Sequence, residues 1–125
     1  NNGIAQIVTA NTGLVVGTTS VAYTAGAAAS GFLSSSIASI TVKSSISVTA
    51  GMVRIWIRNS GGTKFCLWEI PVNTLTKSGT AQTFEHVMAF DNDLEIAADW
   101  GINASTENAE NFNVIVEGND WKYEA

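Results

Sequence analysis

Cysteine, proline, histidine and charged residues are all scarce in this 125-residue chain. Its single cysteine, Cys66, excludes an intrachain disulfide, so we expect folding in a reducing compartment and not as a disulfide-rich secreted scaffold. One histidine, His86, together with one cysteine is too few for the usual zinc ligand sets. No uninterrupted run of about twenty apolar residues occurs, so no membrane partner is predicted.

Positive charge is especially sparse, which bears on nucleic acid as a partner. The chain has six basic and eleven acidic residues and a net charge of −5. The basic residues are scattered from Lys43 to Lys122 without forming a run or stripe. Because binding to a phosphate backbone depends on clustered Lys and Arg, the sequence argues against nucleic acid.

Residues 1–42 contain no Asp, Glu, Lys or Arg at all. A free surface needs charge for solubility, so we expect much of this third of the chain to face protein, either the core or a partner. The length fits one domain spanning residues 1–125. Residues 1–16 are then a candidate N-terminal arm or partner-docking segment.

Short alternating apolar segments separated by Gly, Asn, Asp and Ser clusters predict an all-β protein. Eight to ten such strands favour a two-sheet antiparallel β-sandwich of jelly-roll or Greek-key type. Outside the central hairpin, strands are expected at residues 4–9, 14–16, 19–24, 36–44, 80–90, 94–96, 99–105 and 112–117. Turns are expected at residues 91–93 and 118–120, the latter leading into a frayed tail.

The clearest segment is a hairpin over residues 52–72, with its turn at residues 59–62. In its first strand Val53, Ile55 and Ile57 make one aliphatic face, opposite Arg54, Trp56 and Arg58. In its second strand Cys66, Trp68 and Ile70 are expected on one face and Phe65 and Leu67 on the other. Pro71 cannot donate a ladder hydrogen bond, so a sheet edge or a bulge is expected there.

No catalytic constellation is evident, so the sequence predicts a non-enzymatic protein without a cofactor. His86 alternates with Phe84 and Met88, which favours a packed or rim imidazole over a catalytic base. Cys66 is expected to be a small buried hydrophobe. The acidic group of Asp91, Asp93, Glu95 and Asp99 lacks the spacing of a calcium loop, so a solvated rim is favoured and no metal site is predicted.

One face of the hairpin carries functional potential. Arg54, Trp56 and Arg58 combine the residue types that protein interfaces are enriched in, so we assign them as a candidate partner interface. An exposed indole between polar donors is also a platform on which a sugar ring can stack. The strand alone does not separate these alternatives.

Four segments stand out in the chain: GTTSVAYTAG (residues 17–26), VRIWI (53–57), LWEIPV (67–72) and ASTENAENFNV (104–114). Together they resemble a family of small bacteriophage virion structural proteins. The resemblance implies a β-sandwich that decorates a capsid, binds the major capsid protein or another virion protein, and forms a homo-oligomer such as a trimer. It also implies assembly in the bacterial cytoplasm and residence in the virion. The alternative is a carbohydrate-binding module or an adhesin or tail-fibre tip domain.

Overall fold

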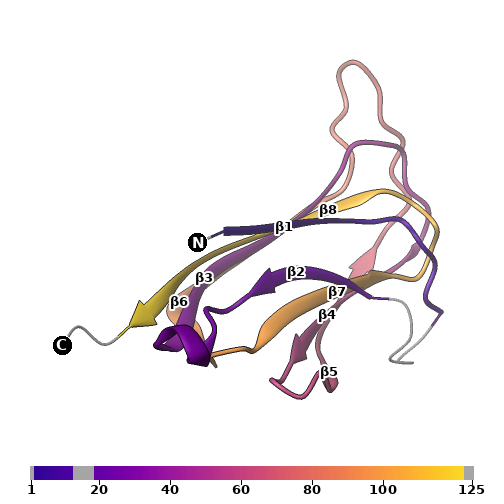
Figure 1. Cartoon of the computed structure of the whole chain (residues 1–125). Coiled ribbons are helices and arrows are strands. Elements are labelled where there is room, and N and C mark those ends of the chain that lie inside the picture. The colour runs from indigo at the N-terminus through magenta and orange to yellow at the C-terminus, as the bar shows by residue number, and fades with distance from the viewer. Residues whose placement is uncertain (1, 13–18, 123–125) are drawn as a thin grey trace.

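Eight strands and one short 3-10 turn make up the regular structure of residues 2–12 and 19–122, which the computed structural model describes (Figure 1). The elements are β1 (Asn2–Ile7), β2 (Ser20–Thr24), η1 (Ala28–Ser30), β3 (Phe32–Ser44), β4 (Gly51–Arg58), β5 (Lys64–Val72), β6 (Glu85–Ala97), β7 (Gly101–Thr106) and β8 (Phe112–Lys122). The predicted all-β class is therefore confirmed. No helix in the described part of the chain is long and apolar enough to cross a membrane.

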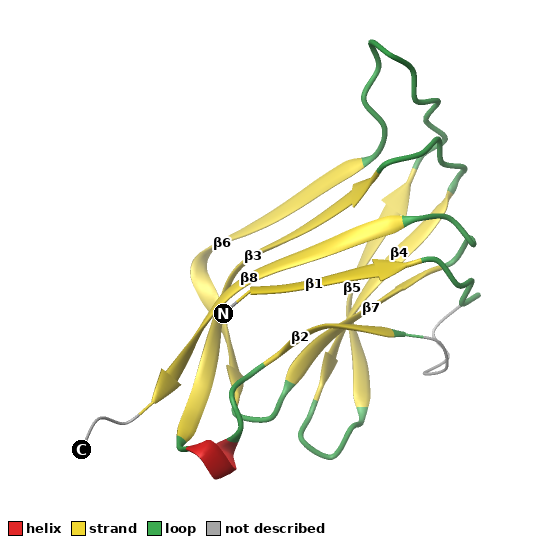
Figure 2. Ribbon diagram, turned by 45° about the horizontal axis from the view of Figure 1, so that its top comes forward, coloured by secondary structure: helices red, strands yellow, loops and turns green. Residues whose placement is uncertain are grey.

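The strands form two four-stranded antiparallel sheets, with strand orders β1-β8-β3-β6 and β2-β7-β4-β5. Figure 2 shows them as two layers, so the predicted two-sheet antiparallel β-sandwich is confirmed. The pairs are nested: the first strand pairs with the last, β2 with β7, β3 with β6 and β4 with β5. Long-range pairing thus connects the charge-free N-terminal third to the charged remainder of the chain.

The core lies between the layers and follows the two-residue alternation of the strands. From one sheet come the buried residues Ile37, Ile40, Val42, Phe112, Val114 and Val116, and from the other Val53, Ile55, Ile70, Ile102 and Ala104. The two open sides of the sandwich, where the edge strands of the two sheets meet, are closed by different contacts. Trp68 of β5 packs on Phe90 of β6 with ring centroids 5.4 Å apart. On the opposite edge Gly3 of β1 lies so close to β2 that a Cβ there would be 1.9 Å from the carbonyl oxygen of Ala22.

The central hairpin is confirmed as β4 and β5, and β5 is the edge strand of its sheet, as Pro71 predicts. A register shift makes one face assignment wrong. Ile55 lies opposite Trp68 while Trp56 lies opposite Cys66, so β5 has one extra residue, Leu67. This bulge places Cys66 and Trp68 on opposite faces of the strand, although the alternation predicts them on one.

Two predicted boundaries in the second half of the chain are also wrong. β6 continues through the expected turn at residues 91–93, which becomes a bulge: residues 90–93 lie opposite the single Ala38. β8 continues through the expected turn and tail to Lys122, because the long β3 offers it a partner along its whole length. A smaller shift in β2 places Val21 outward and Tyr23 inward, although a strict two-residue alternation would put both on one face.

The candidate arm, residues 1–16, is placed only in part. Asn2–Ile7 pairs with β8 at the edge of its sheet, and Ala10 bridges Thr106 in parallel. The strand expected at residues 14–16 lies outside the described residues. Whether the segment docks on a partner stays a prediction, and within the described residues its first strand belongs to the sandwich itself.

Candidate functional site

The structure brings Arg54, Trp56 and Arg58 onto the outward face of β4, opposite the core residues Val53 and Ile55. We call these three residues the β4 strip. Little of the strip is open to solvent, because Arg54 is 8% exposed and Trp56 only 2%. Arg58 is half-buried. The assignment of the three residues as a partner interface stays a prediction, but only Arg58 offers it much surface.

Trp56 is held by a buried hydrogen bond. Its indole Nε1–H donates to Oγ of Ser105 on β7 over 2.9 Å, and Ser105 is itself 2% exposed. A buried N–H without a partner would cost about 1–3 kcal/mol, so this bond explains why a polar serine is tolerated at the position. A ring so covered has no free face for a sugar, and a stacking platform at Trp56 does not fit this structure.

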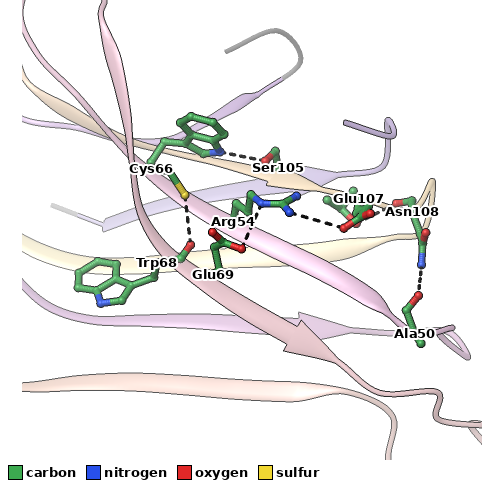
Figure 3. Close-up of polar contacts among 10 residues, drawn as sticks. Ala50, Arg54, Cys66, Trp68, Glu69, Ser105, Glu107 and Asn108 are labelled. Atoms are coloured by element: carbon green, nitrogen blue, oxygen red, sulfur yellow. Dashed lines mark hydrogen bonds and ion pairs between the residues drawn. The ribbon is translucent and has the colours of Figure 1, made fainter. Parts of the chain in front are cut away.

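Arg54 lies between two carboxylates, as Figure 3 shows. Its Nε is 3.7 Å from Oε2 of Glu69 on β5, and its Nη2 is 3.7 Å from Oε2 of Glu107. Nε and Nη1 are buried and have no hydrogen-bond partner. The guanidinium therefore relies on two charges at longer range, and it cross-links β4 to its edge strand and to the segment that follows β7.

Arg58 completes the strip by joining β4 to β7 and β2. Its Nη1 donates to Oδ1 of Asn103, and its Nη2 donates to Oγ1 of Thr24 over 3.2 Å. Asn103 is 1% exposed, and its Nδ2 donates a further hydrogen bond to Oγ1 of Thr19. The strip thus stabilises the sheet at each of its three residues.

Cys66 is half-buried on the same outward face as Trp56, and not in the core where the sequence predicts it. Burial raises the pKa of its thiol, the carboxylate of Glu69 raises it further, and Arg54 partly opposes the shift. The neutral thiol is therefore favoured near neutral pH. Such an environment suits a packing role, since a reactive cysteine needs a stabilised thiolate.

The acidic group around β6 is dispersed by its bulge. Asp91 and Asp93 are exposed, and Glu95 accepts a hydrogen bond from Oγ of Ser34 over 2.8 Å. Asp99 adopts φ 67°, a conformation that Asp tolerates, and accepts from the backbone N–H of Ala28. Across residues 2–12 and 19–122, no three His, Cys, Asp or Glu side chains gather as a metal site requires.

His86 lies on β6 opposite Val42 of β3 and is exposed at the sheet edge. This agrees with the rim position expected for it.

A hydrogen-bonded cluster that the sequence does not reveal joins three strands at one end of the sandwich. The Tyr23 hydroxyl is hydrogen-bonded to Oγ of Ser35. Oδ1 of Asp120 lies 2.7 Å from Oγ of Ser35 and 3.2 Å from the Tyr23 hydroxyl. Because each hydroxyl has one hydrogen, one of them donates to the carboxylate while the other donates to its neighbouring hydroxyl. The backbone N–H of Gly26 also donates to Oδ1 of Asp120. Tyr23 and Ser35 are 2% and 0% exposed, so the cluster is closed to a substrate and acts as a clamp between β2, β3 and β8.

The most distinctive open surface is the outward face of the β1-β8-β3-β6 sheet. Its register aligns Ile4, Ile115, Thr41 and Val87 in one row across all four strands, which we call the apolar row. Its ends are open, with Ile4 69% and Val87 54% exposed, while the two middle residues are half-buried. The sequence shows each residue as an outward position but not that four strands bring them into line.

The rows on either side of the apolar row are polar at every position except Ala89. On one side lie Gln6, Asn113, Lys43 and Glu85, and on the other Asn2, Glu117, Ser39 and Ala89. Three of these eight residues are charged, and none of the three comes from β1. Comparison of the chain with protein-family models, with curated proteins and with solved structures finds no match, so the interpretation of this face rests on its own geometry.

Proposed function

We propose that the protein is a non-enzymatic structural component of a bacteriophage virion, most simply a capsid decoration protein that binds and stabilises the head lattice. Three features support the proposal: the resemblance of residues 17–26, 53–57, 67–72 and 104–114 to small virion proteins, the arrangement of the strands, and the position of the charge-free strands. In this proposal it assembles in the bacterial cytoplasm and acts in several copies on the major capsid protein or another virion protein.

The nested strand pairs favour the jelly-roll form of the sandwich. A long hairpin in which β1 pairs with β8, β2 with β7, β3 with β6 and β4 with β5, rolled so that successive pairs fall in different sheets, has this order. Jelly rolls are common in viral capsid proteins and also in lectins. Fold alone does not decide function, so this support is an analogy.

The observation that carries the proposal is where the described part of the charge-free segment, residues 2–12 and 19–42, lies. These residues supply β1, β2 and all of β3 except its last two residues. The outward positions that residues 1–42 contribute beside the apolar row are Asn2, Gln6 and Ser39, all uncharged, and Lys43 is the one charged position that β3 adds there. Depletion of charge marks the centre of protein interfaces, so a broad face of this kind suits protein contact.

Binding to capsids tests the proposal. The gene neighbourhood of the chain identifies the major capsid protein, from which expanded capsids are assembled and sedimented with the purified protein. We expect saturable co-sedimentation with capsids and none with an unrelated particle of the same size. A neighbourhood without phage structural genes, or a protein that stays in the supernatant, would contradict the proposal.

Carbohydrate binding is the second candidate, and Trp121 is the observation that favours it. This indole is 55% exposed on the β1-β8-β3-β6 face, and its Nε1–H donates to Oγ of Ser36 over 2.7 Å. Its neighbours include Ser34, which donates to Glu95. A ring fixed at its edge, with hydroxyl and carboxylate groups beside it, is the arrangement that stacks on a pyranose.

A glycan array separates the two candidates. Binding to a sugar that Trp121→Ala abolishes, with no binding to capsids, would favour the carbohydrate reading. Trp56→Phe is the matched control, because its ring is covered and its loss should leave sugar binding unchanged.

A further inference from the structure

We propose that the β1-β8-β3-β6 face binds the same face of a second copy, forming a weak two-fold dimer centred on the apolar row of Ile4, Ile115, Thr41 and Val87. Single exposed apolar residues are ordinary on protein surfaces. These four differ because the register brings them side by side, one from each strand of the sheet. They form a continuous band flanked by polar rows, which is the pattern of an interface core and its rim.

The band is shaped for a flat partner. Its middle is made by the branched side chains of Ile115 and Thr41. The adjacent outward positions are Ser39 and Lys43 on β3 and Asn113 and Glu117 on β8, so the two long charged side chains lie on opposite sides of the row. Two sheets pack face to face at about 10 Å when such side chains interdigitate, with the strands of the two sheets about 30° apart. A second sheet with the same row meets these requirements.

Self-pairing also satisfies the charges. A two-fold axis that lies in the interface plane and bisects the angle of about 30° between the strands of the two copies places the apolar row against that of the second copy, with Ile4 nearest Val87. The same operation places Lys43 over Asn113, Glu85 over Gln6 and Glu117 over Ser39 of the second copy. No two like charges then face each other, although the face carries one basic and two acidic residues in these rows. Such self-complementarity is what a two-fold interface requires.

The size of the face sets the strength of the pair. Four strands over the six residues of β1 cover about 400 Å² of flat area per copy, given the spacing of strands and residues. Interfaces of this size belong to the weak class. We therefore expect a dimer that forms at about 10–100 µM and not at nanomolar concentration. The pair does not depend on the virion assignment, because it is carried by the register and charges of this face alone.

Sedimentation velocity from 1 to 500 µM tests the dimer with paired substitutions. Val87→Glu should weaken association at least about tenfold, because it buries a charge against Ile4 of the second copy. Val21→Glu is the matched control: Val21 is also 54% exposed but lies on the other sheet, so its substitution should leave association unchanged. Circular dichroism melts establish that both variants remain folded.

A charge-swap experiment fixes the geometry. Ile4→Lys alone should weaken self-association as Val87→Glu does, whereas an equimolar mixture of the two variants should recover the dimer through a lysine–glutamate pair across the interface. A wild-type chain that stays monomeric to 500 µM, a trimer, equal sensitivity to Val21→Glu, or a mixture that remains monomeric would each overturn the proposal. Capsid co-sedimentation is measured separately, so failure of the dimer and failure of the virion assignment are distinguishable.

Discussion

Ser105→Ala tests whether the outward face of β4 is built for stability and not for binding. The substitution leaves the indole N–H of Trp56 without its acceptor in a site where both residues are 2% exposed. A buried unsatisfied donor costs about 1–3 kcal/mol, so the free energy of unfolding should fall by that amount. For a domain of this size the midpoint of thermal unfolding should fall by about 3–10 °C.

Ser36→Ala is the matched control. Ser36 accepts the same kind of bond, from Nε1 of Trp121 over 2.7 Å, but at an exposed site where water replaces it. Its loss should cost less than about 0.5 kcal/mol. Trp56→Phe alone leaves Ser105 without its donor, so the double variant Trp56→Phe/Ser105→Ala should show a coupling energy of about 1 kcal/mol.

Urea denaturation followed by far-ultraviolet circular dichroism is the assay, because it does not depend on the tryptophan signal that the variants change. If Ser105→Ala proved no more destabilising than Ser36→Ala, the indole of Trp56 would be open to water. The outward face of β4 around Arg54 and Trp56 would then again be a candidate interface or ligand platform.

Three further predictions follow from single sites. Gly3→Ala places a Cβ 1.9 Å from the backbone oxygen of Ala22 and should lower the free energy of unfolding by more than about 3 kcal/mol or prevent folding. Gly79→Ala, with no atom within 4 Å of the new Cβ, should change it by less than about 0.5 kcal/mol in the same denaturation assay. Equal costs would contradict the close approach of β1 to β2. Tyr23→Phe should lose about 1–2 kcal/mol by removing the hydroxyl of the inter-sheet clamp, and an unchanged midpoint would contradict its role. Alkylation of Cys66 by iodoacetamide should report a higher thiol pKa in the folded chain than in urea, because burial disfavours the thiolate. The unfolded chain then loses the thiol proton at lower pH, so the free energy of unfolding should fall as the pH rises above the pKa of the unfolded thiol. A lower thiol pKa in the folded chain would refute this prediction.

The alternation of apolar residues was enough to predict the class, the two-sheet sandwich and the central hairpin. Val53 and Ile55, and likewise Val114 and Val116, point into the core as their spacing predicts. Pro71 correctly marked β5 as an edge strand. These successes share a cause. Burial on one face of a strand imposes a two-residue period of apolar residues that can be recognised within a short stretch of sequence.

The failures also share a cause. Register shifts at Leu67, at Ala22 and opposite Ala38 are decided by partner strands distant in sequence, and each reverses or displaces the faces that follow it. Turn-forming residues such as Gly118 were drawn into β8 because β3 is long enough to pair with them. Tertiary pairing overrode local turn propensity at these points.

The candidate site shows the same division. The sequence found the Arg54, Trp56 and Arg58 strip but not its burial, because that depends on Ser105 and Asn103, about fifty residues away. The apolar row is the opposite case. Its members are individually unremarkable, and only the pairing of four strands makes them one surface.

The proposed virion role is tested most directly by co-sedimentation of the wild-type protein with expanded capsids, assembled from any major capsid protein found in its gene neighbourhood. We expect saturable binding at a fixed ratio of protein to capsid subunit, and Val21→Glu, a substitution at an exposed position of the other sheet, should leave the binding intact. Absence of binding to capsids, combined with binding to a glycan that Trp121→Ala removes, would contradict the proposed role.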